Sequence, residues 1–316
     1  MMQEIPQSLI EAVRYFSDIR LCTKYMRKIK WPDGKIVCPK CESKRIGEIA
    51  TRNMLRCKDC RKQFSCKVDT IFEDSPLGLD KWFVAVWCIA NSKNGISSHE
   101  LGRALDVTQK TAWFMLHRIR EAMKTGSFRK LEGEVETDET FIGGKARNMH
   151  RAIREKKITG RGGSGKTIVH GMIERGGDAR CSVVKDTEAG TVQVAVRQNV
   201  EKGSTIYSDE MPSYGGLEFG YTHEVINHAK SYVEGRVHTN SMENFWSLLK
   251  RSLAGTYVAV APFHLCRYLD EQTFRFNKRK GSDASRFYEV LLSVVGKRLT
   301  YRTLTAQGDA GFMGIQ

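Results

Sequence analysis

The sequence predicts an α/β fold in which a mixed sheet with flanking helices follows two smaller modules. Three observations support this prediction. Short runs with strand character alternate with helical segments over residues 131–253. Two Cys-x-x-Cys pairs lie between Cys38 and Cys60, and apolar residues recur at helical spacing over residues 79–124. We expect an N-terminal segment with the cysteine pairs at 1–75, a helical module at 76–126, the α/β core at 130–280 and a C-terminal helical extension at 281–316.

The charge balance indicates a polyanionic partner. The 316 residues include 51 Lys and Arg against 36 Asp and Glu, which gives a formal net charge of +15. Residues 20–67 hold fifteen Lys/Arg and four Asp/Glu, and residues 143–166 hold eight and one. Clustered cations favour binding to nucleic acid, because neutralised phosphates release their counterions. The alternative is a protein that is basic without binding a polyanion.

Composition also predicts where the protein acts. The sequence has no apolar run of about 18 residues, so we expect no membrane span. Its first residues lack the basic segment followed by an apolar one that is typical of a secretory signal. Nine cysteines without such a signal indicate a reducing compartment. We therefore expect a cytoplasmic protein that acts on nucleic acid.

The two cysteine pairs have the spacing of a zinc site. Cys38 and Cys41 form the first pair, and Cys57 and Cys60 form the second. Each tight turn can present two thiolates, so that four sulfurs surround one tetrahedral Zn²⁺ in a zinc ribbon. Redox-active pairs are the alternative. A module of this size builds little core, so we expect structural zinc to supply most of its folding free energy.

A helix-turn-helix layout follows the first long helix. Ser97 and Glu100 fit a capping box, from which a short helix runs to Leu105. After a turn, Thr108 caps a longer helix that ends at Met123. In such modules the second helix reaches base edges or phosphates, and an ordinary helical hairpin is the alternative. The residues expected to contact DNA are Gln109, Lys110, Thr111 and Arg118.

The pattern over residues 131–253 is that of a ribonuclease-H-like core. The first strand lies within 131–144 and alternates in side-chain character. Three acids occupy separate elements: Asp138 on the first strand, Asp209 after the fourth, and Glu243 on a late helix. The other expected elements are strands at 167–174, 181–185, 205–208 and 222–227, and helices at 191–200 and 240–253.

These three acids suit the binding of two Mg²⁺ (or Mn²⁺) ions. Ions about 4 Å apart can activate an attacking oxygen and stabilise a leaving one in phosphodiester chemistry, and such hard cations prefer carboxylate ligands. Taken singly, an Asp at a strand end is more often a turn former or solvated. Alternation predicts that Glu139 faces opposite to Asp138, and Glu210 is expected to begin a loop.

Two cations follow on the same late helix. Lys250 lies seven residues after Glu243, which is two helical turns on and the same face. We expect Lys250 to hold a phosphate of the DNA end, with Arg251 beside it as a further DNA contact. A surface ion pair is the alternative for Lys250.

Residues 160–167 match the phosphate-binding pattern G-x-x-x-x-G-K-T without its context. That pattern requires a strand before it and a helix after it. A basic, glycine-rich stretch precedes it here, and the strand-like residues 167–173 follow. We therefore expect a basic loop that closes over DNA, and no nucleotide hydrolysis.

Several motifs together resemble the insertion-sequence transposases of the zinc-ribbon DDE type with an ISXO-type transposase domain (the IS fifteen-ninety-five group). They run in order from about residue 25 to 280, and HTNSMENFWSLLKR is the most specific. The resemblance implies a ribonuclease-H-like fold, Mg²⁺-dependent strand cleavage and transfer, and recognition of terminal inverted repeats in double-stranded DNA. By motif, it assigns the acidic triad to Asp138 in VETDET, Asp209 in YSDE and Glu243 in NSMENFW, with Lys250 in LLKR behind them.

Two other functions stay open at this point. One is a DNA-binding regulator with a zinc ribbon, a helix-turn-helix and a decayed or repurposed core. The other is a structure-selective nuclease that cuts and never joins. A transposase must bring two element ends to one target DNA, so for that function we expect a homodimer or a higher assembly.

Overall fold

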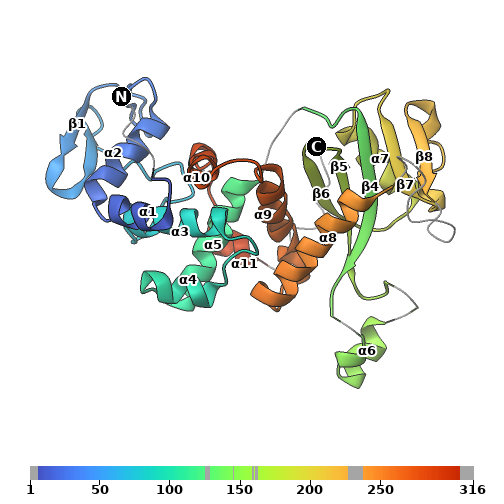
Figure 1. Cartoon of the computed structure of the whole chain (residues 1–316). Coiled ribbons are helices and arrows are strands. Elements are labelled where there is room, and N and C mark those ends of the chain that lie inside the picture. The colour runs from blue at the N-terminus through green and yellow to red at the C-terminus, as the bar shows by residue number, and fades with distance from the viewer. Residues whose placement is uncertain are drawn as a thin grey trace. The chain divides into compact units, whose positions relative to one another are not determined.

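The computed structural model describes residues 6–124, 129–144, 146–158, 160, 163–226 and 238–306 (Figure 1). They form two compact units. The first unit combines residues of the range 1–124 with residues of the range 280–316, and the second comprises residues of the range 125–279. None of the described helices combines the length and the hydropathy that a membrane span requires.

The first unit consists of helices and a small antiparallel sheet. The sheet has the strand order β1-β2-β3, with β1 at Ile46–Ile49, β2 at Met54–Cys57 and β3 at Gln63–Phe64, and the short helix η1 (Ala50–Arg52) joins β1 to β2. The helices are α1 (Leu9–Phe16), α2 (Ile19–Lys30), α3 (Leu79–Asn91), α4 (Ser98–Leu105), α5 (Gln109–Met123), α10 (Asp283–Leu292) and α11 (Tyr301–Thr305).

Aromatic rings form the core of this unit. Phe16 from α1, Phe83 from α3 and Phe287 from α10 are all fully buried. The ring centroid of Phe287 lies 5.1 Å from that of Phe16, 6.0 Å from that of Phe83 and 5.4 Å from that of Trp87. The segment after residue 280, which the sequence presents as a separate extension, thus packs its apolar face against helices from the beginning of the chain.

The pair α4–α5 has the predicted boundaries. Ser97 and Glu100 form the capping box, and Thr108 caps α5 through its side chain. The turn between them needs a left-handed residue, which is Asp106 at φ 51°. It also lies close to α4, because a Cβ on Gly102 would stand 3.0 Å from the carbonyl oxygen of Val107. This close approach accounts for the glycine.

The second unit is built on a mixed five-stranded sheet of order β6-β5-β4-β7-β8. Its strands are β4 (Glu134–Ile142), β5 (Thr167–Glu174), β6 (Ala179–Val184), β7 (Thr205–Asp209) and β8 (Thr222–Ile226). Its main helices are α6 (Arg151–Lys157), α7 (Ala189–Asn199), α8 (Asn240–Ser252) and α9 (Leu265–Asn277). The short helical segments are η2 (Ala146–Asn148), η3 (Pro212–Tyr214), η4 (Leu217–Phe219), the π-helical η5 (Leu253–Tyr257) and η6 (Pro262–His264).

Strand direction brings the ends of β4 and β7 together. β4 pairs antiparallel with β5, and β5 pairs antiparallel with β6. On its other side β4 pairs parallel with β7, and β7 pairs parallel with β8. Because the paired strands β4 and β7 run in the same direction, their carboxyl ends meet at one edge of the sheet.

Helices cover both faces of this sheet (Figure 1). On one face, α8 and α9 bury Phe245, Leu249 and Leu269 against Val169 and Ile173 of β5. On the other face, α7 is packed through Val192 and Val196 in a cluster that also holds Val135, Met172 and Ile206. Alternate residues of β4 therefore point to different helices, as the period of two requires. The G-x-x-x-x-G-K-T stretch leads into β5 at Thr167, so a strand follows it where a nucleotide-binding loop needs a helix.

Candidate functional site

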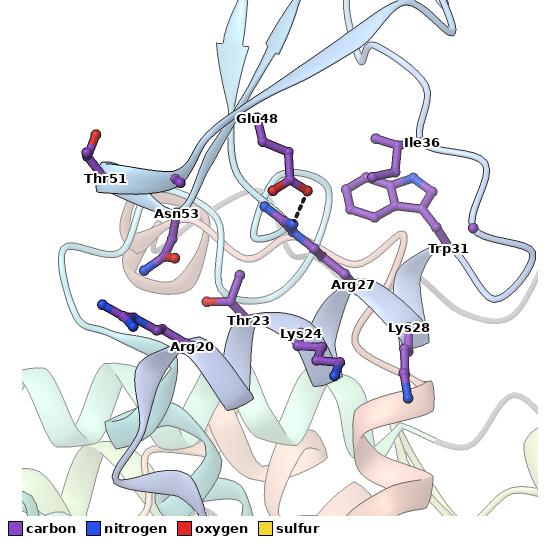
Figure 2. A pocket seen from close by; sticks show the side chains of 12 residues that line it. Arg20, Thr23, Lys24, Arg27, Lys28, Trp31, Ile36, Glu48, Thr51 and Asn53 are labelled. Carbon is purple, nitrogen blue, oxygen red and sulfur yellow. Dashed lines mark hydrogen bonds and ion pairs between the residues drawn. The ribbon is translucent and has the colours of Figure 1, made fainter. Parts of the chain in front are cut away.

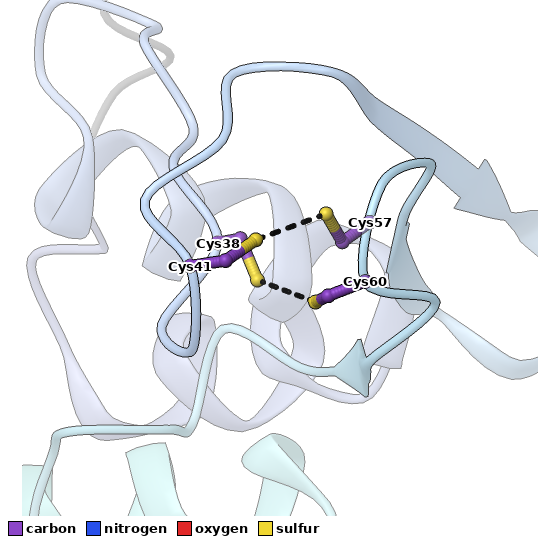
Figure 3. A group of neighbouring side chains, drawn as sticks. All are labelled: Cys38, Cys41, Cys57 and Cys60. Atoms are coloured by element: carbon purple, nitrogen blue, oxygen red, sulfur yellow. Dashed lines mark hydrogen bonds between the residues drawn. The ribbon is translucent and has the colours of Figure 1, made fainter.

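The four predicted zinc ligands lie together in the first unit (Figure 3). Cys38 and Cys41 lie in the loop before β1, Cys57 ends β2, and Cys60 follows in the turn to β3. Their sulfur atoms all lie within 4.8 Å of one another, with 3.5 Å between Cys38 and Cys60 and 3.6 Å between Cys41 and Cys57.

This geometry fits a structural zinc ion. Four thiolates at about 2.3 Å from one tetrahedral ion have sulfurs about 3.8 Å apart, close to the distances found here. The backbone also favours a thiolate, because the N–H of Cys60 donates to Cys57 and lowers the pKa of that thiol to about 6. All four cysteines are free thiols, so the cluster is no disulfide pair.

Two of the three predicted catalytic acids come from neighbouring parallel strands. Glu136 of β4 lies opposite Tyr207 of β7 in the sheet register. Two residues further along each strand stand Asp138 and Asp209, the latter being the last residue of β7. The parallel pairing therefore carries both carboxylates to the same edge of the sheet.

The third acid, Glu243, comes from the first turn of α8, where its side chain is exposed. Burial, together with the negative charges of Asp209 and Glu243, raises the pKa of Asp138 to about 6. The three acids are therefore electrostatic neighbours. They are more widely spread than the thiols, since the four-cysteine cluster is the only group of three or more such ligands within 4.8 Å of one another in the described parts of the chain.

The donor set at this edge suits hard divalent cations. Carboxylate oxygens are the preferred ligands of Mg²⁺, and a bound cation relieves the repulsion between neighbouring carboxylates. Asp138, Asp209 and Glu243 are the residues that could hold such ions.

A glycine lets α8 approach the sheet. Asp138 lies opposite Gly171 of β5, and a Cβ on Gly171 would stand 2.6 Å from both the Met242 and the Trp246 side chains. The Trp246 indole therefore lies directly on the strand, and its Nε1–H donates to Asp138 Oδ2 at 2.9 Å. The other oxygen of Asp138 accepts the backbone N–H of Glu139 at 2.8 Å. These two bonds fix the carboxylate of Asp138.

Glu136 holds the beginning of α8, and the sequence reasoning assigned it no role. Its side chain is fully buried on the same face as Asp138. Oε2 accepts the backbone N–H groups of Ser241 at 2.8 Å and Met242 at 3.1 Å, and Oε1 accepts the Ser241 hydroxyl at 3.0 Å. A carboxylate at a helix N-terminus satisfies free N–H groups and interacts favourably with the helix dipole.

Arg175 connects this contact to the neighbouring strand. Its Nε donates to Glu136 Oε1 at 2.9 Å, and its guanidinium lies 3.9 Å from the ring centroid of Tyr207. The Tyr207 hydroxyl in turn donates to Glu134 at 2.9 Å. Glu136, Tyr207 and Ser241 each precede one of the three acids by two residues. We call Glu136, Arg175, Tyr207 and Ser241 the clamp, because they join the three acid-bearing elements directly behind the acids.

Glu139 faces away from Asp138, as alternation predicted. Its carboxylate accepts the hydroxyl of Tyr214 at 2.7 Å, on the face opposite α8. Its side chain is only 2% exposed, and burial raises its pKa to about 7. No local pattern in the sequence indicates this burial.

The predicted DNA contacts on α5 divide into two groups. Gln109 and Lys110 are exposed in its first turn, and Thr111 is half-buried beside the capping Thr108. The expectation for Arg118 was wrong. Its guanidinium is buried between the rings of Trp82 and Phe114, donates to the Glu73 carbonyl, and has a pKa lowered to about 10 by desolvation. A side chain 4% exposed cannot reach DNA.

Lys250 and Arg251, the remaining predicted DNA contacts, are exposed near the end of α8. Lys250 follows Glu243 by two turns on that helix. The exposed line on α8 thus begins with an acid and ends with cations, which suits a metal at one end and phosphates at the other.

Comparison with known proteins finds a family match for the region of the four cysteines and another for the region of the three acids. Residues 130–277 match the family described as ISXO2-like transposase domain, and residues 20–63 match that described as transposase zinc-ribbon domain. The chain is 28% identical over 255 residues to a protein in transposable element ISH50 of Halobacterium salinarum, covering 77% of this chain and 85% of that protein. It is 31% identical over 96 residues to a transposase-like protein of Haemophilus influenzae, covering 30% of this chain and 77% of that protein.

Proposed function

The chain belongs to the transposases that combine an ISXO2-like domain with a transposase zinc ribbon, and we propose that it cuts and joins DNA at the ends of an insertion sequence. The observation that supports this proposal is the parallel pairing of β4 with β7, which carries Asp138 and Asp209 to one edge of the sheet, while the charge of Glu243 on α8 also acts on Asp138. The strand order and directions, with α7 between the third and fourth strands, support a ribonuclease-H-like core.

Each residue has a role in this proposal. Asp138, Asp209 and Glu243 would hold two Mg²⁺ (or Mn²⁺) ions. When bound, these ions would activate the attacking oxygen and stabilise the leaving oxygen of a phosphodiester. Lys250 and Arg251 bind the phosphates of the DNA end along α8. Trp246 orients Asp138 through its indole N–H and shields one carboxylate oxygen from water.

No covalent enzyme intermediate is required, so no Ser or Tyr nucleophile is assigned. Water is the attacking group when a 3′-hydroxyl is released at the element end, and that hydroxyl attacks the target DNA in the second step. The same three acids serve both steps, because each step replaces one oxygen on phosphorus by another.

The first unit supplies recognition in this proposal. The zinc ribbon and the α4–α5 pair, acting as a helix-turn-helix, select the terminal inverted repeats, with Gln109, Lys110 and Thr111 at the DNA. Two ends must be joined to one target, so the active form is a dimer or a larger assembly.

The decisive experiment incubates the full chain with a labelled element end, target DNA and Mg²⁺. We expect cleaved and joined products, and a fall of at least about a hundredfold in both for Asp138→Asn and Glu243→Gln, because a metal ligand is lost. Glu210→Gln is the matched control, since it removes an exposed carboxylate beside Asp209. Cleavage without joining would identify a nuclease, and binding without turnover would identify a regulator.

A further inference from the structure

A basic groove lies within the first unit, between α2 and the zinc ribbon (Figure 2). It encloses about 650 Å³. One wall is α2, with Arg20, Lys24, Arg27 and Lys28, and Trp31 follows at the end of the helix. The opposite wall is the turn from β1 through η1 to β2. We call this the α2–ribbon groove.

The charge of the groove is strongly positive. Its lining includes four cations and one carboxylate, Glu48. Arg27 pairs with Glu48 at 2.7 Å. Arg20, Lys24 and Lys28 are exposed, and no ion pair joins any of them to another residue that the structure describes. Three exposed cations of α2 thus line the groove without an ion-pair partner among the described residues, and such a local excess of positive charge favours the binding of a polyanion.

The helix presents these cations as a line. Arg20, Lys24 and Lys28 are separated by four residues each, so they lie on one face at intervals of about 6 Å. The opposite face of α2 is fixed in the core, because Cys22 and Met26 are fully buried. The cationic face therefore cannot turn inward. A line of cations at this interval matches an extended chain of phosphates better than one small anion.

We propose that the α2–ribbon groove binds the phosphate backbone of duplex DNA, independently of base sequence. The proposal rests on the proposed function, in which this unit meets the element ends. Contacts from cationic side chains to phosphates contribute affinity and position but carry no sequence information, so base recognition is left to other elements. Glu48 weakens the contact, because it neutralises Arg27.

The first test removes two cations. Lys24→Gln with Lys28→Gln should raise the Kd equally for an element end and for random duplex. It should also lower the slope of log Kd against log salt by about 2, since two phosphate contacts are lost. The control is Lys93→Gln with Lys202→Gln, two exposed lysines outside the groove. Fluorescence anisotropy in buffer without divalent metal measures the Kd, and zinc content and thermal unfolding verify the fold.

The second test is a substitution that should strengthen DNA binding instead of weakening it. Glu48→Gln should tighten duplex binding, because it frees Arg27, whereas a variant that merely damages the unit weakens binding. Glu42→Gln is its control, an exposed acid of the same ribbon that does not line the groove. We expect a larger gain for Glu48→Gln than for Glu42→Gln.

Three results would overturn the proposal: an unchanged salt slope in the lysine double variant, equal effects of the two glutamate variants, or a loss confined to single-stranded DNA. The last would assign the groove to unpaired bases stacked on Trp31. Because binding is measured without divalent metal, a chain that never cleaves DNA can still pass this test. Conversely, if the chain cleaves and joins DNA but the lysine double variant leaves the salt slope unchanged, only the groove proposal is refuted and the proposed function stands.

Discussion

His170 of β5 is fully buried, and its Nε2 lies 2.9 Å from the Thr137 hydroxyl oxygen. Burial lowers its pKa from 6.5 to about 4. Below pH 6.5 the unfolded chain binds a proton that the folded chain does not. The folded state therefore loses stability as the pH falls from about 6.5 towards 4, and at pH 5 the loss is about 2 kcal/mol.

Glu139, which faces His170 across the strands, acts in the opposite direction. Burial raises its pKa from 4.5 to about 7, so the folded state gains stability as the pH falls from about 7 towards 4.5. We expect the two contributions to offset each other in the wild type. In His170→Asn only the gain remains. When the pH falls from 7.5 to 5, the free energy of unfolding of the variant should therefore rise by about 2 kcal/mol relative to that of the wild type.

Pulsed hydrogen–deuterium exchange of β4 and β5 across a urea series measures this difference for the second unit alone. A difference between the two proteins that stays constant over this pH range would show that His170 titrates normally.

Single residues were predictable where a strict period or a motif fixed them. Alternation along β4 separated Asp138 from Glu139, and the cysteine spacing identified the zinc ligands. Arg118 and Arg175 were not predictable. Each guanidinium meets partners from distant parts of the sequence, and nothing local distinguishes a buried arginine from an exposed one.

At the level of elements, the clamp decides how α8 meets the sheet. Glu136→Gln removes the charge that binds both the helix N-terminus and Arg175, so α8 should be held less rigidly and Glu243 displaced. Under the proposed function Glu136 would be a positioning residue, and changes behind metal ligands typically weaken metal binding about 10- to 100-fold. We expect the Kd for Mn²⁺, measured by electron paramagnetic resonance, to rise by at least about tenfold.

A graded series separates positioning from simple destabilisation. Ser241→Ala loses one bond to Glu136 and should weaken Mn²⁺ binding only a few-fold. Glu174 ends β5 and pairs with Arg129 instead of with the beginning of α8, so Glu174→Gln should leave the Mn²⁺ affinity unchanged. If Glu136→Gln lowers the melting temperature but binds Mn²⁺ like Glu174→Gln, the clamp supports the fold and has no role in the site.

Elements of the sheet were predictable because five runs with strand character, separated by turns, leave little ambiguity. The lateral order of the strands was not explicit in the sequence, since pairing joins segments that lie far apart. The π-helical turn Leu253–Tyr257 was also unforeseen. Its one-residue change of period depends on packing, such as the contact of Tyr257 with Tyr268 of α9.

At the scale of the whole chain, the second unit is an insertion between two parts of the first. The expectation of a helical extension after residue 280 did not include its partner, because Phe287 lies about two hundred residues from Phe83 and Trp87 in the sequence. Contacts at such separation leave no local pattern. The core of the first unit therefore needs α10, which follows the whole second unit in the sequence.

This arrangement predicts a selective effect of Phe287→Ala. The ring is fully buried among three other aromatic rings, so its removal should cost about 3–5 kcal/mol. The loss should fall on the first unit: exchange in α1 and α3 should accelerate, and exchange in β4 and β5 should not. Leu292→Ala, half exposed at the end of the same helix, should change neither. Equal acceleration in both units would mean that they unfold together, and no change in α3 would mean that α10 contributes nothing to its core.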